Sequence, residues 1–452
     1  MWFTVKFLLK YVRYNQEEML LRRKLFLLGM ILFVLLCFSL VVSVEAASMW
    51  SRTYEGAEID IAYSLIETSD GGYALAGSMF VKTDEFGNKE WNKTYGGIAC
   101  SLVATSDGGY ALAGASYASG AEQADFWLAK IDALGNMEWN RTYGGTDEDV
   151  AYSLVVSTDG GYVLAGDTWS FGAGGADFWL VKTDANGVME WNRTYGGTGD
   201  DCARALVATS DGGYAIAGIC NCATWVPWYY VGFYEGGDVW LVKTDALGNM
   251  EWNQTYGGTG GDLALSLVAT SDGGYALAGT WNYTLSLSSE GGGDFWLVKT
   301  DEFGNTQWDR KYGGTGEDLA YSLIATSDDG YALAGAFNFS GTFGTGSADA
   351  WLVKTDSLGD MEWNGTYGGT GDDWACSVIA TSDGGYALAG TLNYVYYLSL
   401  EDGGDYHGDF WFVKTDELGV VPEYSSWLIP SIVLATSLFM IVNKKRLLHK
   451  RS

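Results

Sequence analysis

Residues 271–279 read Ser-Asp-Gly-Gly-Tyr-Ala-Leu-Ala-Gly, and the chain repeats this phrase or a close variant seven times. Its tyrosine recurs at intervals of 37, 52, 52, 61, 56 and 55 residues, at Tyr73, Tyr110, Tyr162, Tyr214, Tyr275, Tyr331 and Tyr386. Self-similarity at a period of about 40 to 50 residues is the signature of a protein built from repeated supersecondary units. The phrase therefore predicts seven structural units.

Two further phrases accompany the copies. Asp-Phe-Trp-Leu-Val-Lys-Thr-Asp recurs with its lysine at Lys82, Lys130, Lys182, Lys243, Lys299, Lys354 and Lys414. Glu-Trp-Asn-x-Thr-Tyr-Gly-Gly follows it only six times, with tryptophans at Trp91, Trp139, Trp191, Trp252, Trp308 and Trp363. The missing copy stands at the other end of the chain, where residues 50–56 read Trp-Ser-Arg-Thr-Tyr-Glu-Gly. A repeat cut out of phase in this way predicts a ring that the N-terminal segment closes.

Each unit contains four short runs rich in aromatic and β-branched residues, which in the fifth unit span residues 264–270, 275–280, 294–300 and 307–312. Ser-Asp-Gly-Gly and Thr-Asp-x-x-Gly-Asn turns separate the runs, so the runs are expected to be antiparallel strands. Four strands per unit and seven units predict an all-β, seven-bladed propeller of four-stranded antiparallel blades.

We name the strands of a blade A to D from the axis outward. Residues 49–54 then supply strand D of the seventh blade and cover its open edge. The first unit has no loop between strands B and C and enters the second through the short Ile98-Ala99-Cys100, so its blade is expected to be distorted.

The alternation of Trp-x-x-Thr-Tyr-Gly-Gly, Thr-Ser-Asp-Gly-Gly-Tyr-Ala-Leu-Ala-Gly and Phe-Trp-Leu-Val-Lys-Thr-Asp-x-x-Gly-Asn resembles the propeller-repeat domains of archaeal and bacterial cell-surface proteins. The resemblance covers about residues 49–416. It implies a fold and a surface location more than a chemistry, because one fold hosts many functions.

The N-terminal segment, residues 1–47, reads as an extension and a secretory signal. Arg22-Arg23-Lys24 precedes the apolar stretch 25–44, and small residues at 46–47 offer a cleavage site. An uncleaved signal anchor is the alternative, because twenty apolar residues can span a bilayer. The sequence also leaves open whether translation starts at Met1 or Met19.

The C-terminal segment, residues 421–452, follows the propeller domain of residues 48–420. Its apolar stretch 427–442 precedes Lys444-Lys445-Arg446, the pattern of a membrane segment with a positive cytoplasmic end. Together with Pro422-Glu423-Tyr424 it resembles the Pro-Glu-Phe type of sorting signal that archaeosortases process, with Tyr in place of Phe. Without processing, the segment is a single-span anchor, so we expect hydrophobic helices at both ends of the chain and a propeller displayed outside the cell.

The charge agrees with an extracellular setting. Eleven of the 26 basic residues lie in segments 1–45 and 422–452, against four of the 56 acidic ones, so the region between carries a formal charge of −37. Such a polyanion does not bind nucleic acid. We therefore expect partners to be the membrane, through the C-terminal segment, and an extracellular protein or glycan.

Strand direction separates the two faces of the ring. The uniform A–B and C–D turns share the face from which both termini leave, so this face is predicted to point at the membrane. The opposite face carries the D–A connections and the variable B–C loops, where binding residues usually lie. Exposed aromatics there give rigid area for a sugar or a protein. The candidates are Trp225, Trp228, Tyr229, Tyr230, Tyr234, Trp281, Tyr283, Tyr394, Tyr396 and Tyr397. The alternative is that they fold back and cover one another.

The D–A connections are acidic, and Asp200, Asp201, Asp372 and Asp373 are candidate Ca²⁺ ligands. Paired carboxylates also cleave sugars, but these recur blade after blade, whereas a catalytic pair should break the repeat. Capping of strand A by acceptance of backbone N–H bonds is the favoured interpretation. We therefore expect no enzyme activity and no cofactor, with calcium the one alternative.

Cysteines and sequons suggest modifications. Cys202 lies across a predicted hairpin from Cys220 and Cys222, so it could form a disulfide with either. Seven sequons begin at Asn92, Asn140, Asn192, Asn253, Asn282, Asn338 and Asn364.

The favoured function is ligand binding by a surface-anchored propeller, and the alternatives are an architectural envelope component or a polysaccharide-active enzyme.

Overall fold

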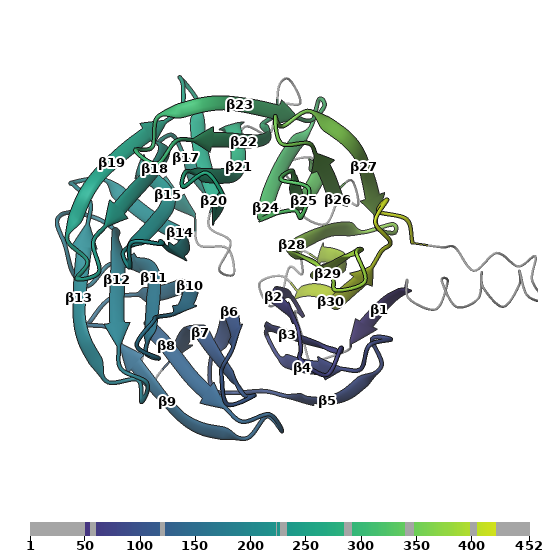
Figure 1. Ribbon diagram of the computed structural model, residues 1–452, viewed down its shortest axis with the longest axis horizontal. Coiled ribbons are helices and arrows are strands. Elements are labelled where there is room, and N and C mark those ends of the chain that lie inside the picture. The colour runs from purple at the N-terminus through teal and green to yellow at the C-terminus, as the bar shows by residue number, and fades with distance from the viewer. Residues whose placement is uncertain are drawn as a thin grey trace, which may run out of the picture. The chain divides into compact units, whose positions relative to one another are not determined.

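The computed structural model describes residues 50–54, 60–117, 123–222, 224–226, 233–283, 292–339, 348–397 and 405–421. Residues Trp50–Val421 form one compact unit, in which seven four-stranded antiparallel sheets surround a central axis (Figure 1). This confirms the all-β, seven-bladed propeller. The predicted terminal helices lie outside the described residues, among which no helix is long and apolar enough to cross a membrane.

Within each blade the strands follow chain order outward from the axis, except at the closing strand. The A strands are β2 (Ala62–Glu67), β6 (Ile98–Ala104), β10 (Asp149–Val156), β14 (Asp200–Ala208), β20 (Gly261–Ala269), β24 (Glu317–Ala325) and β28 (Asp372–Ala380). The B strands are β3 (Tyr73–Gly77), β7 (Tyr110–Tyr117), β11 (Tyr162–Thr168), β15 (Tyr214–Cys222), β21 (Tyr275–Tyr283), β25 (Tyr331–Phe339) and β29 (Tyr386–Tyr397).

The C strands, the most buried of the blade, are β4 (Phe80–Thr83), β8 (Ala124–Ile131), β12 (Asp177–Thr183), β18 (Asp238–Thr244), β22 (Asp294–Thr300), β26 (Asp349–Thr355) and β30 (Asp405–Lys414). The D strands are β5 (Lys89–Lys93), β9 (Met137–Tyr143), β13 (Met189–Tyr195), β19 (Met250–Tyr256), β23 (Thr306–Tyr312), β27 (Met361–Tyr367) and β1 (Trp50–Tyr54). A small hairpin of β16 (Thr224–Val226) and β17 (Phe233–Glu235) extends the B–C loop of the fourth blade.

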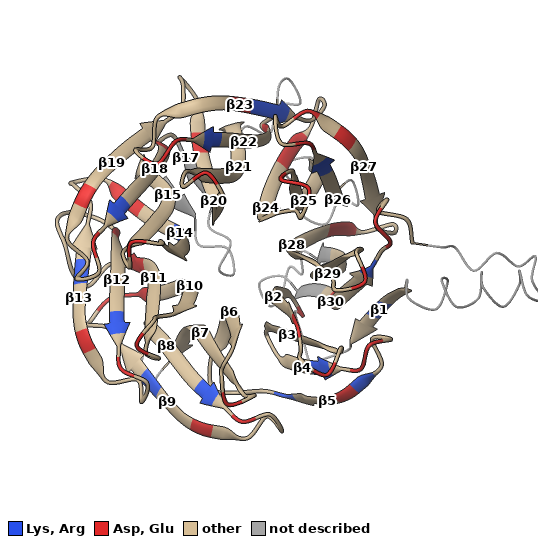
Figure 2. Cartoon of the chain, in the orientation of Figure 1, with Lys and Arg blue, Asp and Glu red and all other residues tan. Residues whose placement is uncertain are grey.

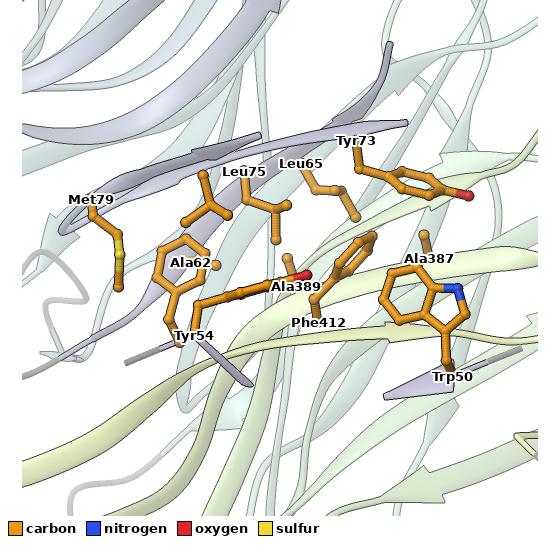
Figure 3. Close-up of a cluster of buried hydrophobic side chains, with 12 residues drawn as sticks. Trp50, Tyr54, Ala62, Leu65, Tyr73, Leu75, Met79, Ala387, Ala389 and Phe412 are labelled. Atoms are coloured by element: carbon orange, nitrogen blue, oxygen red, sulfur yellow. The ribbon is translucent and has the colours of Figure 1, made fainter. Parts of the chain in front are cut away.

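The N-terminal strand closes the ring as predicted. β1 pairs antiparallel with β30, from Trp50 opposite Lys414 to Tyr54 opposite Phe410. Both aromatic side chains of β1 are buried, and the Trp50 ring meets Phe412 edge-on at 4.6 Å between centroids (Figure 3). Burial of large aromatic side chains of this kind stabilises by roughly 1.5–3 kcal/mol each.

Every blade holds its successor by the same contact. The strand D tyrosine hydroxyl donates a hydrogen bond of 2.6–2.8 Å to the carbonyl of a glycine in the next C–D turn. The strand D tryptophan packs against that glycine, whose φ is positive. The seven pairs are Tyr54–Gly87, Tyr95–Gly135, Tyr143–Gly187, Tyr195–Gly248, Tyr256–Gly304, Tyr312–Gly359 and Tyr367–Gly419.

The repeated strand C lysine ties each blade together at its turn end, where Figure 2 shows blue at the end of the third strand. Lys243 bonds Asp211 of the A–B turn and Glu251 of strand D, both at 2.7 Å. Burial alone would lower the pKa of Lys243, but hydrogen bonds and charge from the two carboxylates outweigh it and raise that pKa. The seven strand C lysines thus have a structural role.

The first blade is shortened but keeps its strand order. Residues 78–79 alone join β3 to β4, and β4 has four residues where the other C strands have seven or more. The order β2-β3-β4-β5 is nevertheless that of every blade, and Tyr95 still bonds Gly135. The distortion expected for the first blade is therefore a shortening of its strand C and of its B–C connection.

We expect the contact at the ring closure to be measurable with two glycines of the first blade. A Cβ at Gly87 would lie 2.3 Å from the Trp50 ring, whereas a Cβ at Gly71 meets nothing within 4 Å, and both have positive φ. Gly87→Ala should therefore destabilise by about 1–3 kcal/mol more than Gly71→Ala, because only the former overpacks. Urea unfolding measures the difference. Equal losses would mean that Trp50 does not hold the turn in solution.

Candidate ligand-binding face

The two faces of the ring differ in regularity. On the turn face, each A–B turn has the same pair of backbone hydrogen bonds, as between Thr270 and Gly273 or Gly274, and each C–D turn has a matching pair. On the loop face, the B–C connection ranges from residues 78–79 in the first blade to 223–237 in the fourth. Trp50 pairs with Lys414 at the turn end of β30, and Val421 follows the last turn, so both ends of the compact unit lie at the turn face.

The aromatic residues predicted from the two longest loops fall mostly outside the described side chains. Trp225 and Tyr234 pair across the β16–β17 hairpin, of which the structure gives the backbone. Trp228, Tyr229 and Tyr230 lie outside the described residues. Tyr396 and Tyr397 extend β29 and pair with β30, again as backbone.

Two of the predicted binding aromatics are buried, so the expectation that they are exposed is wrong. Tyr283 is 3 % exposed and packs in a cluster with Leu263. Tyr394 is 4 % exposed and packs on Trp374 with ring centroids 4.9 Å apart. Neither ring is presented to solvent.

Trp281 remains partly exposed and has a partner that the sequence did not reveal. Its ring meets Trp296 edge-on at 4.9 Å, and the Nζ atom of Lys311 lies 3.3 Å from its centroid. Lys311 replaces the threonine of the strand D phrase, and this break in the repeat was the available signal. An ammonium held over an indole is a cation–π contact, and together the two side chains present both an apolar and a cationic group.

Similar aromatic side chains begin the B–C loops of two other blades. Phe171, 43 % exposed, packs on Trp179 at 5.2 Å, and the partly exposed Phe337 packs on Trp351 at 4.9 Å. These rings cover the strand C indoles of their own blades. The described loop face therefore presents separate aromatic edges, one for each of these blades, around the ring.

Carboxylates form a repeated pair at the junctions between blades on this face. The aspartate that begins a C strand meets the aspartate of the next D–A connection beside the first glycine of Tyr-Gly-Gly. The pairs are Asp125 with Asp149, Asp177 with Asp201, Asp238 with Asp262, Asp294 with Asp318, and Asp349 with Asp373. The acidic D–A connections, with Asp201 and Asp373 among their residues, are apparent in the sequence, but their strand C partners are not.

Backbone N–H groups occupy these carboxylates, in agreement with the capping interpretation. Asp201 accepts from Gly197 at 2.7 Å and from Asn221 at 2.9 Å. Asp200 accepts from Ala176 at 3.2 Å. Of the other candidate calcium ligands, Asp373 accepts from the backbone of Gly369 and Asn393, and Asp372 accepts from Ala348. Among the described residues no group of three or more His, Cys, Asp or Glu side chains could hold a metal ion.

Burial raises the pKa of several of these paired carboxyls. Burial first, and the neighbouring Asp201 charge second, raise the pKa of Asp177 to about 6 against the backbone bond from Ala173. Burial and the charge of Asp294 raise the pKa of Asp318 to about 6 despite its two backbone bonds. At these two junctions burial therefore stabilises the protonated form of Asp177 and Asp318 relative to a carboxyl in water.

The innermost strands hold a buried ion pair where two neighbouring blades depart from the repeat. Each A strand has a bulge at the same place, and the bulged residues are Tyr63, Cys100, Tyr152, Arg204, Leu265, Tyr321 and Cys376. Arg204 bonds Asp167 of β11 at 2.7 Å and lies 3.7 Å from the centroid of the Tyr152 ring. Burial raises the pKa of Asp167 to about 6 even with Arg204 beside it.

The five described cysteines are free thiols, so the predicted disulfide is not formed in this structure. Cys202 and Cys222 share a cluster and their thiols are hydrogen-bonded. Cys220 packs in a different cluster, with Trp240. The positive φ of Asn221, which lies between Cys220 and Cys222, and the register shift between Asp200 and Cys202 therefore bring Cys222, not Cys220, to Cys202.

The predicted glycosylation asparagines lie mainly on the outer strands. Asn92, Asn140, Asn192, Asn253 and Asn364 are exposed on D strands, Asn338 is exposed and Asn282 partly buried at B–C loop starts. Asn253 also accepts a bond from the Trp240 indole at 3.2 Å, and equivalent bonds join Asn192 and Asn364 to strand C tryptophans. The repeat thus gives this asparagine a structural role, and its glycosylation stays a prediction.

Comparison with known proteins finds distant structural similarity. No protein-family model and no curated protein matches the chain. Among solved structures, a protein of unknown function from Bacteroides caccae is 12 % identical, with a TM-score of 0.38, over 67 % of this chain and 96 % of that one. BamB from Moraxella catarrhalis is 13 % identical, with a TM-score of 0.39, over 80 % of this chain and 84 % of that one. The Pan2 WD40 domain of Neurospora crassa is 9 % identical, with a TM-score of 0.48, over 83 % of this chain and 98 % of that one.

We expect the buried ion pair to be replaceable by an apolar pair that the chain already uses. At the next junction the same positions carry Leu265 and Ile219, which pack together. Arg204→Leu alone should cost about 3–5 kcal/mol, because it leaves a buried carboxylate unpaired. Arg204→Leu with Asp167→Ile should recover most of that loss in urea unfolding. A double variant no more stable than the single one would show that the pair does more than satisfy its own charges.

Stability should have a maximum at mildly acidic pH. Raised pKa values at Asp177 and Asp318 contribute stability below the unfolded pKa of 3.8, and this is lost as pH rises to about 6. Lowered values of about 2 at Asp211 and Asp328 contribute stability above 3.8, lost as pH falls toward 2. The free energy of unfolding should therefore peak near pH 4. Asp177→Asn should flatten the decline between pH 4 and 6; a decline unchanged in this variant would contradict the assignment.

Proposed function

We propose that this protein is a non-catalytic propeller, held at the cell surface by its C-terminal apolar segment, that binds an extracellular protein or glycan through the loop face. The observation that carries the proposal is the contrast between the faces. The turn face repeats in every blade, whereas the B–C connections change in length and sequence from blade to blade. A rigid scaffold with variable loops on one face is the usual arrangement of a binding protein.

The residues at the loop face support recognition more than chemistry. Trp281 with Lys311, and the edges of Phe171 and Phe337, offer amphipathic and aromatic area of the kind that contributes most at interfaces. The carboxylates of the same face recur at five junctions, and backbone N–H groups already occupy many of their oxygens. A catalytic acid and base would need to differ from their copies in the other blades.

Anchoring is supported by the order of features along the chain. The apolar stretch 427–442 and its basic continuation begin thirteen residues after Lys414, the end of the last strand C. Both ends of the propeller lie at the turn face, so an anchor at either end leaves the loop face turned outward. An architectural role in the envelope uses the same anchor but no loop-face ligand.

Glycan-array and pull-down experiments with the soluble propeller, residues 48–421, test the binding function with and without Ca²⁺. Trp225→Ala with Trp228→Ala, and separately Trp281→Ala, should each weaken binding at least ten-fold, because aromatic anchors dominate such interfaces. Phe303→Ala on the turn face is the matched control and should leave binding unchanged. Absence of any ligand would favour the architectural alternative, and turnover of a polysaccharide would contradict the non-catalytic assignment.

A further inference from the structure

The turn face has an exposed apolar position that the fold does not explain. The second residue after the aspartate of each C–D turn is Phe or Leu in six of the seven blades, with 43 to 70 % of the side chain exposed. These residues are Phe86, Leu134, Leu247, Phe303, Leu358 and Leu418. Exposed apolar side chains that recur in one place on a surface indicate an interaction.

The third blade shows that the turn forms equally well with a polar residue there. Asn186 occupies the position, and its backbone N–H still donates to Asp184 at 2.8 Å. The same bond joins Leu247 to Asp245 at 2.8 Å. The Asn186 side chain adds a donation to Asp184 at 3.5 Å that Phe or Leu cannot make. The turn therefore does not require an apolar residue here, and the apolar character of this position in the other blades needs a separate cause.

The chain outside the propeller limits what can cover this face. Six peptide steps separate Val421 from the start of the apolar stretch at Trp427, and six separate Val44, the end of the N-terminal apolar stretch, from Trp50. Six extended residues reach about 20 Å at most. If either stretch lies in the membrane, the face from which the chain leaves is held within that distance of the lipid.

We propose that the turn face rests on the bilayer that anchors the chain, with the six apolar side chains inserted among the lipid headgroups. This rests on the anchoring in the proposed function and adds the surface that the propeller contacts. The turn aspartates accept bonds from turn N–H groups, and the A–B aspartates are paired with lysines, but Glu85, Glu302 and Glu417 remain in the same turns. Because these glutamates would be repelled by anionic lipid, the bilayer surface that the turn face contacts is of low negative charge.

The full-length protein in phosphatidylcholine vesicles tests this. A fluorophore is attached at Leu247→Cys on the turn face or at Tyr117→Cys on the loop face, where the native side chains are 60 % and 53 % exposed, and the labelled parent gives the background. Brominated lipid should quench the fluorophore at position 247 at least three-fold more than that at 117. Equal, weak quenching overturns the proposal while leaving the anchoring intact. Failure to float with the vesicles overturns the anchoring itself.

Variants that carry the asparagine of the third blade distinguish insertion of the turn-face side chains into the bilayer from mere proximity of the face to it. Leu134→Asn, Phe303→Asn and Leu358→Asn together should reduce quenching at position 247 to the level at 117, without changing the unfolding curve, because Asn186 is native in that place. Unchanged quenching in a folded triple variant overturns the proposal. Energy transfer between labelled copies that persists on dilution in lipid would show that a second copy covers the face, which also overturns it.

Discussion

The ring depends on one contact, in which two aromatic side chains of one blade hold a glycine of the next. Trp191 and Tyr195 lie four residues apart on β13 and therefore on the same side of the strand. The indole packs on Gly248 and the hydroxyl bonds its carbonyl at 2.7 Å. Only glycine satisfies both a φ of 74° and an indole within van der Waals distance. Burial raises the pKa of Tyr195 well above its usual value, so its hydroxyl remains a donor.

Closure follows from that contact, because a ring of seven needs a seventh pair. β1 supplies Trp50 and Tyr54 to Gly87 of the first blade, which joins the first and last repeats directly. On the loop face the backbone N–H of Asp60 bonds Gly408 at 3.1 Å across the same junction. An open array would need capping units at its ends, whereas the closed ring has no terminal blade face to protect.

Blade number, strand order and the closing strand could be predicted from the sequence because the repeat records all three. The burial of Tyr283 could not. Asn282 has a φ of 57° and the pairing of β20 with β21 shifts at Leu263, so the chain turns and the next side chain points inward. A simple alternation along the strand misses this change. Contacts between blades, such as Asp177 with Asp201, are long-range and leave no local signal. For Trp281 with Lys311 the break in the repeat marks Lys311 as unusual but does not name its partner.

The fold constrains the sequence of the turn face more than that of the loop face. At the turn face every blade must supply the glycine, the lysine bridge and the turn aspartate, so little of the sequence there is free. At the loop face the junctions are fixed by backbone and carboxylate groups, which leave the B–C loops unconstrained. The loops can then vary in length and sequence without unfolding the ring. The exposed position at Leu247 and its equivalents is the exception on the turn face: the fold leaves it free, yet it is apolar in six blades, so its cause lies in a surface outside the propeller.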